Sequence, residues 1–204
     1  LDTLPDYQNV AAPVSTLLSV TARLRGRNVR SSLGHVDDEK GIEWSSVVDQ
    51  SLVQGKGYFR TWAGVDLGAA LPLGHSSLWL RSSAGISPGD PDQPYSNFFF
   101  GGFGNNWVDH GNEKRYREQY AFPGKPLNGV SGRNYVRSMV EWNLPPLRFR
   151  HVGKPGFFLT WARTAVFASA LATNLDDAAL GREVTNVGGQ VDLQLTVLSA
   201  LDMT

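Results

Sequence analysis

The sequence predicts an all-β fold, either an antiparallel transmembrane β-barrel or a partial barrel of about nine or ten strands. Three features of the chain indicate this fold. Apolar and polar residues alternate along most of its length, which is typical of strands with one apolar face. The alternating runs are long for a globular protein. The 22 glycines and 11 prolines are spread along the 204 residues, and this favours many turns over long helices.

Alternation defines the predicted strands of the first half of the chain. The runs cover residues 18–25, a weaker stretch at 29–36, and then 42–49, 59–69 and 78–86. In the run 59–69, Phe59 and Leu67 fall on one face, while Arg60 and Asp66 fall on the other. Clusters of glycine and proline separate these runs and predict turns between them.

The second half of the chain continues the pattern. Three phenylalanines at 98–100 run into a glycine pair, an alternating run follows at 136–142, and the clearest run, 191–203, closes the chain. We expect turns at Pro145-Pro146 and at 151–156, and a loop or helical turn at 175–183. The longest apolar run, 165–172, is far shorter than the ~18 residues that a spanning helix needs, so no transmembrane helix is expected.

Strand length and charge placement distinguish a barrel from a sandwich. Several runs reach ~9–13 residues, whereas globular strands have a mode of ~5–6 and a tilted membrane-spanning strand needs ~9–11. Charged side chains inside the strands would face solvent in a sandwich and the wet lumen in a barrel. Short and long connections also alternate, as in outer-membrane barrels. Five of the six tryptophans lie in predicted strands, where aromatic girdles and core packing are equally good interpretations.

The segment FFFGGFGNN at 98–106 points to function more than any other part of the chain. Glycine at the end of a strand marks a tight bend or a close backbone approach, here expected at Gly101 and Gly102. The residues from about 101 to 132 contain no clear strand, and loops of that length are usually functional or disordered. We therefore expect one β domain, residues 1–204, with a long inserted loop at about 101–132.

Four charged residues are candidates for holding this loop. Arg137 and Glu141 lie four residues apart on one predicted strand, so they share a face. If that face lines a lumen, Arg115 or Arg117 in the loop could pair with Glu141 or with Asp66. Arginine suits this role because its planar fork binds a carboxylate through two hydrogen bonds. The alternative is an ordinary pair of surface charges.

Composition and motifs argue against several other functions. Lys plus Arg and Asp plus Glu each number 19, so the chain lacks the basic excess of a dedicated nucleic-acid binder. Cysteine is absent, the four histidines are scattered, and the acidic groups at 37–39 and 90–92 lack the pattern of a calcium loop. Residues 129–133 do not form a nucleophile elbow. We expect no catalytic residues, no cofactor, no metal and no enzymatic activity.

The span from about Ser76 to Thr204 resembles the C-terminal barrel of the bacterial surface antigen family, the outer-membrane barrels that act in protein assembly, insertion and two-partner secretion. The resemblance is carried by SLWLRSSAG at 77–85, FFFGGFGNN at 98–106 and NYVRSMVEWNLPPLRF at 134–149. Family members have a strand ending in Gly-Gly, a segment folded into the lumen, and a strand with a glutamate before "PL". That glutamate corresponds to Glu141 here.

The resemblance implies a protein of the bacterial outer membrane that contacts lipid and client outer-membrane or secreted proteins. It implies that the segment at 101–132 occupies the lumen as a plug or latch. This chain departs from the family at Asn105-Asn106, where an Arg-Gly signature is expected, and its arginines come later, at 115 and 117.

Three further expectations accompany this reading. The chain begins at Leu1 without a signal-peptide pattern, which indicates a mature form or an internal fragment. The main alternative function is a soluble β-sandwich module that binds carbohydrate or another ligand, with exposed Trp and Tyr as a stacking platform. An all-β enzyme is a weaker alternative, because no acid, base and nucleophile set is evident.

Overall fold

The computed structural model describes residues 16–103, 114–154, 156–197 and 201–203. The described chain is all-β, as predicted, and its only helical pieces are two short 3₁₀ turns. Nine strands form one antiparallel sheet, in the order β1-β2-β3-β4-β7-β9-β10-β11 with β8 beside β9. Their bounds are β1 Leu17–Arg30, β2 Lys40–Val53, β3 Lys56–Ala70, β4 Ser77–Ile86, β7 Asn134–Asn143, β8 Leu147–Lys154, β9 Phe157–Thr173, β10 Arg182–Val197 and β11 Leu201–Met203.

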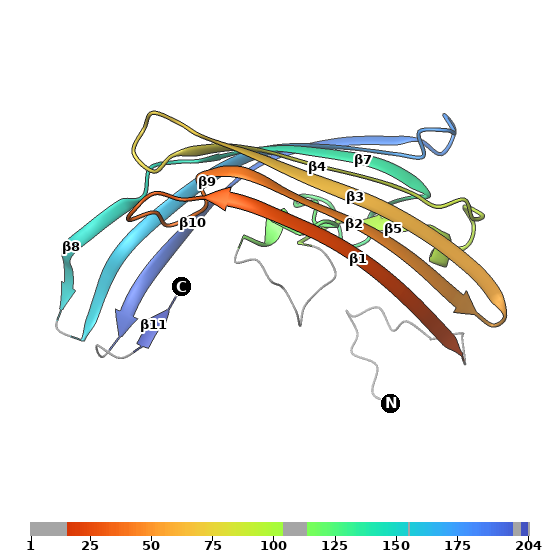
Figure 1. Ribbon diagram of the computed structural model, residues 1–204, viewed down its shortest axis with the longest axis horizontal. Helices are drawn as coiled ribbons and strands as arrows, with labels where there is room; N and C mark the ends of the chain where they lie inside the picture. The colour runs from red at the N-terminus through yellow and green to blue at the C-terminus, as the bar shows by residue number, and fades with distance from the viewer. Residues whose placement is uncertain (1–15, 104–113, 155, 198–200, 204) are drawn as a thin grey trace.

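The sheet curls into an arch, the shape of half a barrel (Figure 1). Several strands are long, with 15 residues in β3, where alternation predicts the run 59–69, and 17 residues in β9, where it predicts no run. Within the described residues the sheet does not close, because β1 pairs only with β2 and β10 pairs beyond β9 only with the three residues of β11. The fold is therefore an open, strongly curved sheet and not two large sheets packed face to face.

Strands β7 and β8 lie end to end beside β9. Both pair antiparallel with β9, β7 along Ala165–Thr173 and β8 along residues 157–162. The expected turn at Pro145-Pro146 is therefore wrong, because the chain passes from β7 to β8 without reversing direction. Proline has no N–H to donate to the ladder, so the pair interrupts the strand line instead of ending it in a hairpin.

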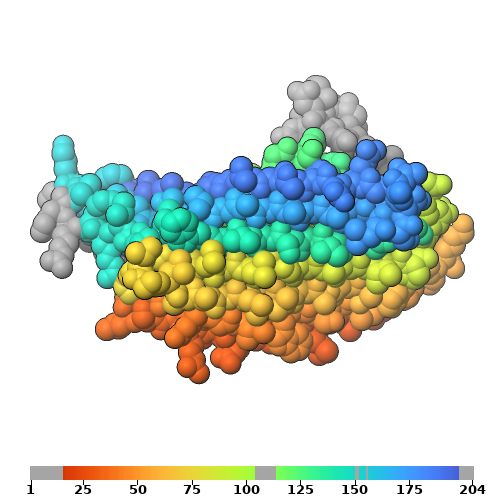
Figure 2. Space-filling view, turned by 90° about the horizontal axis from the view of Figure 1, so that it is seen from above, coloured from red at the N-terminus to blue at the C-terminus, as the bar shows by residue number. Residues whose placement is uncertain are grey.

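The two faces of the arch differ in chemistry. The concave face carries the charged and polar partners of each alternation, and the convex face carries the apolar ones. Figure 2 looks onto the convex face, where the strands form parallel bands with no described loop over them. Its exposed apolar side chains are Leu18, Val20, Leu24, Ile42, Trp44, Val48, Leu52, Phe59, Leu67, Leu78, Leu80, Ile86, Val136, Val140, Trp142, Val166, Val187, Val191 and Leu193.

The tryptophans divide between these faces. Trp44 and Trp142 lie exposed on the convex face, whereas Trp79 is buried on the concave face and Trp62 is partly buried there. Core packing therefore accounts for Trp62 and Trp79, and the girdle interpretation stays a prediction for Trp44 and Trp142. No helix in the described ranges is long and apolar enough to span a membrane.

The loop between β1 and β2, residues 31–39, folds across one end of the concave face. Its backbone reaches strands that lie far from β1 in the sheet. The guanidinium of Arg163 on β9 donates to the carbonyl oxygen of Val36 at 3.0 Å, and the Trp79 indole on β4 donates to that of Asp38 at 3.2 Å. This loop therefore covers the concave face at the end where β3 turns into β4.

Candidate functional site

The candidate site is the long segment between β4 and β7, residues 87–133, called the inserted segment. It leaves the sheet at Ser87, passes through a 3₁₀ turn at Pro94–Ser96, and forms a second sheet from β5 (Phe98–Phe100) and β6 (Val130–Gly132). A second 3₁₀ turn covers Arg115–Arg117. The segment lies under the arch, against the concave face (Figure 1). It starts earlier than the expected loop at 101–132.

The three phenylalanines 98–100 form a strand, as predicted, but not a strand of the barrel sheet. They pair only with β6, inside the inserted segment. The reason is local: Ser87 to Asn97 turn the chain away from β4, so the FFF strand lies over the concave face. The sequence pattern could not separate these cases, because a short aromatic strand looks the same in either sheet.

The glycine pair has the close approach that its sequence context predicts. Gly101 is buried with φ +152°, and a Cβ there would lie 1.9 Å from the carbonyl oxygen of Pro126. Gly102 has φ +52° and accepts a hydrogen bond from the Phe122 N–H at 3.0 Å. Glycine is needed at 101 because any side chain would displace the returning chain at Pro126.

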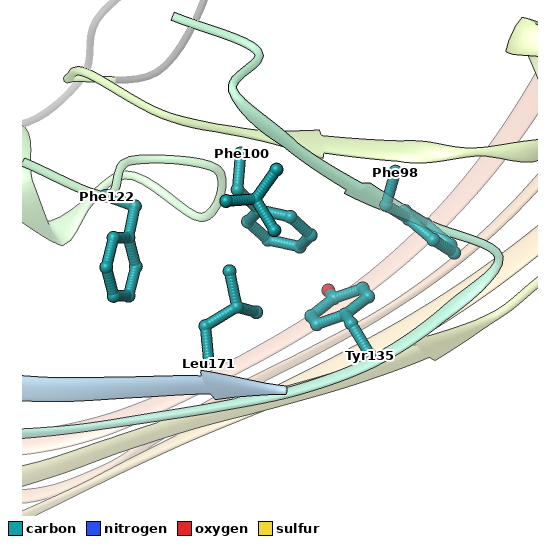
Figure 3. Packing of buried hydrophobic residues seen from close by; sticks show 6 residues of the cluster. Phe98, Phe100, Phe122, Tyr135 and Leu171 are labelled. Atoms are coloured by element: carbon teal, nitrogen blue, oxygen red, sulfur yellow. The ribbon is translucent and has the colours of Figure 1, made fainter. Parts of the chain in front are cut away.

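An aromatic cluster fixes one end of the inserted segment to the sheet. Phe98, Phe100 and Phe122 come from the segment, and they pack on Tyr135 of β7 and Leu171 of β9 (Figure 3). The centroid of the Tyr135 ring lies 4.9 Å from that of the Phe98 ring and 4.8 Å from that of the Phe100 ring, and both pairs are edge to face. Edge-to-face aromatic pairs add to the stabilisation that burial provides.

The turn at Arg115–Arg117 is held by a stacked ring and a buried cation. The Tyr116 ring stacks on Phe167 of β9 at 4.1 Å between centroids. Arg137 of β7 is 5% exposed, and its guanidinium donates to the carbonyl oxygens of Tyr116 at 3.0 Å and Glu118 at 3.2 Å. Arg137 thus binds the backbone of the inserted segment and none of the carboxylates in its described part.

Glu141 of β7 is the centre of an ionic cluster, and it is completely buried. Arg117 donates to it with Nε at 2.9 Å and with Nη2, so the guanidinium binds both carboxylate oxygens. Arg81 of β4 donates its Nε to the same carboxylate at 2.9 Å and binds Asp66 of β3 with Nη1. Lys114 Nζ lies 3.5 Å from Glu141 Oε1. Buried charges are tolerated only with such partners.

Asp37, in the β1–β2 loop, completes the ionic cluster from the other side. Its Oδ2 accepts hydrogen bonds from Lys114 Nζ at 2.8 Å and Arg117 Nη2 at 2.9 Å. The cluster then contains three carboxylates and three cations: Asp37, Asp66, Glu141, Arg81, Lys114 and Arg117. Its formal charges balance, which suits a site with little access to water.

The pKa values of the inserted cations and of Asp37 reflect these contacts. Burial alone would raise the pKa of Asp37, but Arg117 and Lys114 outweigh it and hold that pKa well below its usual value. Burial also opposes the charge on Arg117, yet Glu141 raises its pKa further above the usual range. For Lys114, burial and the nearby Arg117 lower the pKa. The surroundings therefore favour the charged form of Arg117 and disfavour the charged form of Lys114.

The residues expected to form the site are only partly together. Arg117 and Glu141 pair, whereas the guanidinium of Arg115 lies 5.9 Å from the ring centroid of Phe103. Asp66 contacts the cluster through Arg81 and not through a loop arginine. Asn105 and Asn106 lie outside the described residues.

Sequence reasoning missed Lys114, Arg81 and Asp37 as members of the cluster. Arg81 had a usable signal, because it lies on the polar face of its strand. No sequence pattern pointed to Asp37, because the β1–β2 loop that carries it meets the cluster only in the folded sheet.

The ionic cluster is suited to holding the inserted segment against the sheet. The cavity beside Asp37, Lys114 and Asn143 has a volume of about 10 Å³, about the room that one water molecule needs. The described residues contain no group of His, Asp or Glu side chains that could hold a metal ion.

Models of known protein families, curated proteins and solved structures were each compared with this chain, and none of them matches it.

Proposed function

We propose that this chain forms part of a β-barrel in the bacterial outer membrane, and that the barrel assists the insertion or translocation of other proteins. The proposal has no catalytic step and needs no cofactor. The observation that carries it is the apolar convex face, which spans every long strand from β1 to β10, while the charged residues in the interior of these strands lie on the concave face.

That distribution of side chains is the reverse of the one expected in water. Soluble monomers rarely expose a contiguous apolar patch of more than a few hundred Å². Here exposed apolar residues lie side by side on neighbouring strands, and Val187 is 84% exposed. In a transmembrane barrel the same face would contact lipid and the polar face would line the lumen.

The inserted segment would then lie in the lumen as a plug. The aromatic cluster and the ionic cluster fix it to the wall at two separate places. The resemblance of residues 76–204 to the bacterial surface antigen family supports a role for such a segment as a latch, with Arg117 as the latch arginine. Client outer-membrane or secreted proteins would be the partners.

A membrane location also places a requirement on the edges of the sheet. Unpaired backbone groups are very unfavourable in lipid, so only a closed barrel is stable there. Strands outside the described sheet would have to pair with β1 and β10. Slow hydrogen exchange of the β1 amides and of the β10 amides that do not pair with β9 would report that these edges are paired in the assembled protein.

The central test compares two neighbouring positions on one strand. Because the chain has no cysteine, Val191→Cys and Gln190→Cys can each carry a single spin label. Val191 lies on the convex face and Gln190 on the concave face of β10. After reconstitution in lipid vesicles, we expect collisions with oxygen to dominate at 191 and collisions with a water-soluble nickel complex at 190.

Two results would contradict the membrane proposal. One is equal access of the water-soluble reagent to both positions. The other is a monodisperse product in plain buffer that does not bind detergent or lipid, which would favour the soluble binding module instead.

A further inference from the structure

The β1–β2 loop and the inserted segment reach the ionic cluster from opposite ends of the sheet. The inserted segment starts where β4 ends, at Ser87, whereas the β1–β2 loop lies at the end where β4 begins, at Ser77. They meet at Asp37, whose carboxylate binds Lys114 and Arg117 of the segment. The side chain of Lys114 is 2% exposed, so this contact is largely shielded from solvent.

Two carboxylates share the same two cations. Arg117 Nη2 donates to Asp37 Oδ2 and also to Glu141 Oε1, and Lys114 Nζ lies near both groups. One carboxylate belongs to the wall of the sheet and the other to a loop. The segment is thus held between them, and movement of either carboxylate changes the environment of both cations.

The loop carries its own supports, which do not involve the segment. Glu39 accepts hydrogen bonds from the backbone N–H and the hydroxyl of Ser32, both at 2.8 Å, and it pairs with His75 in the β3–β4 turn. Asp38 and Val36 are bound through their carbonyl oxygens to Trp79 and Arg163. These contacts fix the conformation of the loop, and this conformation places Asp37 at the cluster.

We infer that the β1–β2 loop is a second latch on the inserted segment, and that it couples one end of the sheet to the segment inserted from the other end. A change that moves this loop loosens the segment, and a change that loosens the segment loosens the loop. The tip of the loop can be contacted from solvent, because Leu33 is fully exposed there. The inference concerns the same site as the proposed function, but it holds whether or not the sheet lies in a membrane.

The test measures hydrogen exchange of the whole chain in the medium that keeps it folded. Asp37→Asn removes the charge and keeps the size of the side chain. We expect the amides of residues 114–122 to exchange about tenfold faster, because two buried cations lose one of their carboxylates. Asp38→Asn is the matched control, since the Asp38 carboxylate binds the exposed Arg27 and Ser31 and no residue in the described part of the segment. Its effect on these amides is expected to stay within about twofold.

Coupling must act in both directions. Lys114→Gln, a change in the segment, is therefore expected to speed exchange in residues 31–39. The double variant Asp37→Asn with Glu141→Gln is expected to differ from the sum of the single changes, because both carboxylates bind the same cations.

Three results would overturn the inference. They are unchanged exchange at 114–122 in Asp37→Asn, an effect in one direction only, or equal acceleration across β3 and β4, which would make Asp37 a general stability residue. The spin-label experiment is read out on the convex face and is independent of these amides. A failure of the membrane proposal can therefore be told apart from a failure of the coupling.

Discussion

Arg117 binds both carboxylate oxygens of Glu141, and the two residues belong to an inserted segment and to the sheet that it lies on. Glu141 is completely buried, so its charge is stable only while cations surround it. Three cations do so, and two of them, Lys114 and Arg117, come from the inserted segment. The pair therefore links the position of the segment to the stability of the sheet.

Replacing Arg117 is expected to loosen the segment at the ionic cluster. Arg117→Ala leaves Glu141 with Arg81 and Lys114 only, and the loss is expected to destabilise the folded state by about 2–4 kcal/mol. Urea unfolding, with chymotrypsin cleavage of the segment as a second readout, measures the effect. Lys125→Ala is the matched control, because Lys125 is an exposed cation of the same segment and its removal is expected to change the stability by about 0.5 kcal/mol or less. Equal effects of the two substitutions would argue against Arg117 as the latch.

The aromatic cluster is expected to hold the segment independently of the charges. Phe100 is 0% exposed between Tyr120 and Tyr135, so Phe100→Ala is expected to destabilise the protein by about 3–5 kcal/mol. Phe103→Ala removes a half-exposed ring from the same segment and is expected to cost about 1 kcal/mol or less. Both are measured by urea unfolding. A mild effect at Phe100 would mean that the ionic cluster alone positions the segment.

In β7, alternation alone predicted which face each residue occupies. Arg137 and Glu141 were placed together on the polar face, and both are buried there. This inference worked because side-chain direction in a strand depends only on parity, which is a local property. The partners could not be predicted in the same way. Arg81 reaches Glu141 because β4 pairs with β7 in one particular register, and register depends on residues far apart in the sequence.

The path of the chain outside the sheet also could not be predicted from the sequence. Asp37 reaches Arg117 although 80 residues separate them, because the β1–β2 loop folds over the concave face. The break at Pro145-Pro146 is similar, since a proline pair is compatible both with a hairpin and with an interrupted strand. Only the pairing of β8 with β9 distinguishes the two cases.

Gly101 is expected to tolerate no side chain. Its φ is +152°, and a Cβ would lie 1.9 Å from the Pro126 carbonyl oxygen, so Gly101→Ala forces the backbone at Pro126 away from residue 101. We expect a loss of about 2 kcal/mol or more in the free energy of unfolding. Gly74→Ala is the control, because no atom lies within 4 Å of a Cβ there, and its effect is expected within about 0.5 kcal/mol. Similar results for both would mean that the turn at 101 relaxes freely.

Acid is expected to loosen the inserted segment through Asp37. Its pKa in the folded protein lies below the ordinary value because Arg117 and Lys114 outweigh burial. A lowered folded pKa stabilises the fold above the ordinary Asp pKa of about 4, and this stabilisation is lost as the pH falls below that value. Hydrogen exchange at residues 114–122, corrected for the intrinsic rate, is expected to rise between neutral pH and about pH 3. Asp37→Asn should remove part of that rise, and Asp38→Asn should not. An identical pH profile in wild type and Asp37→Asn would assign the acid response to other carboxylates.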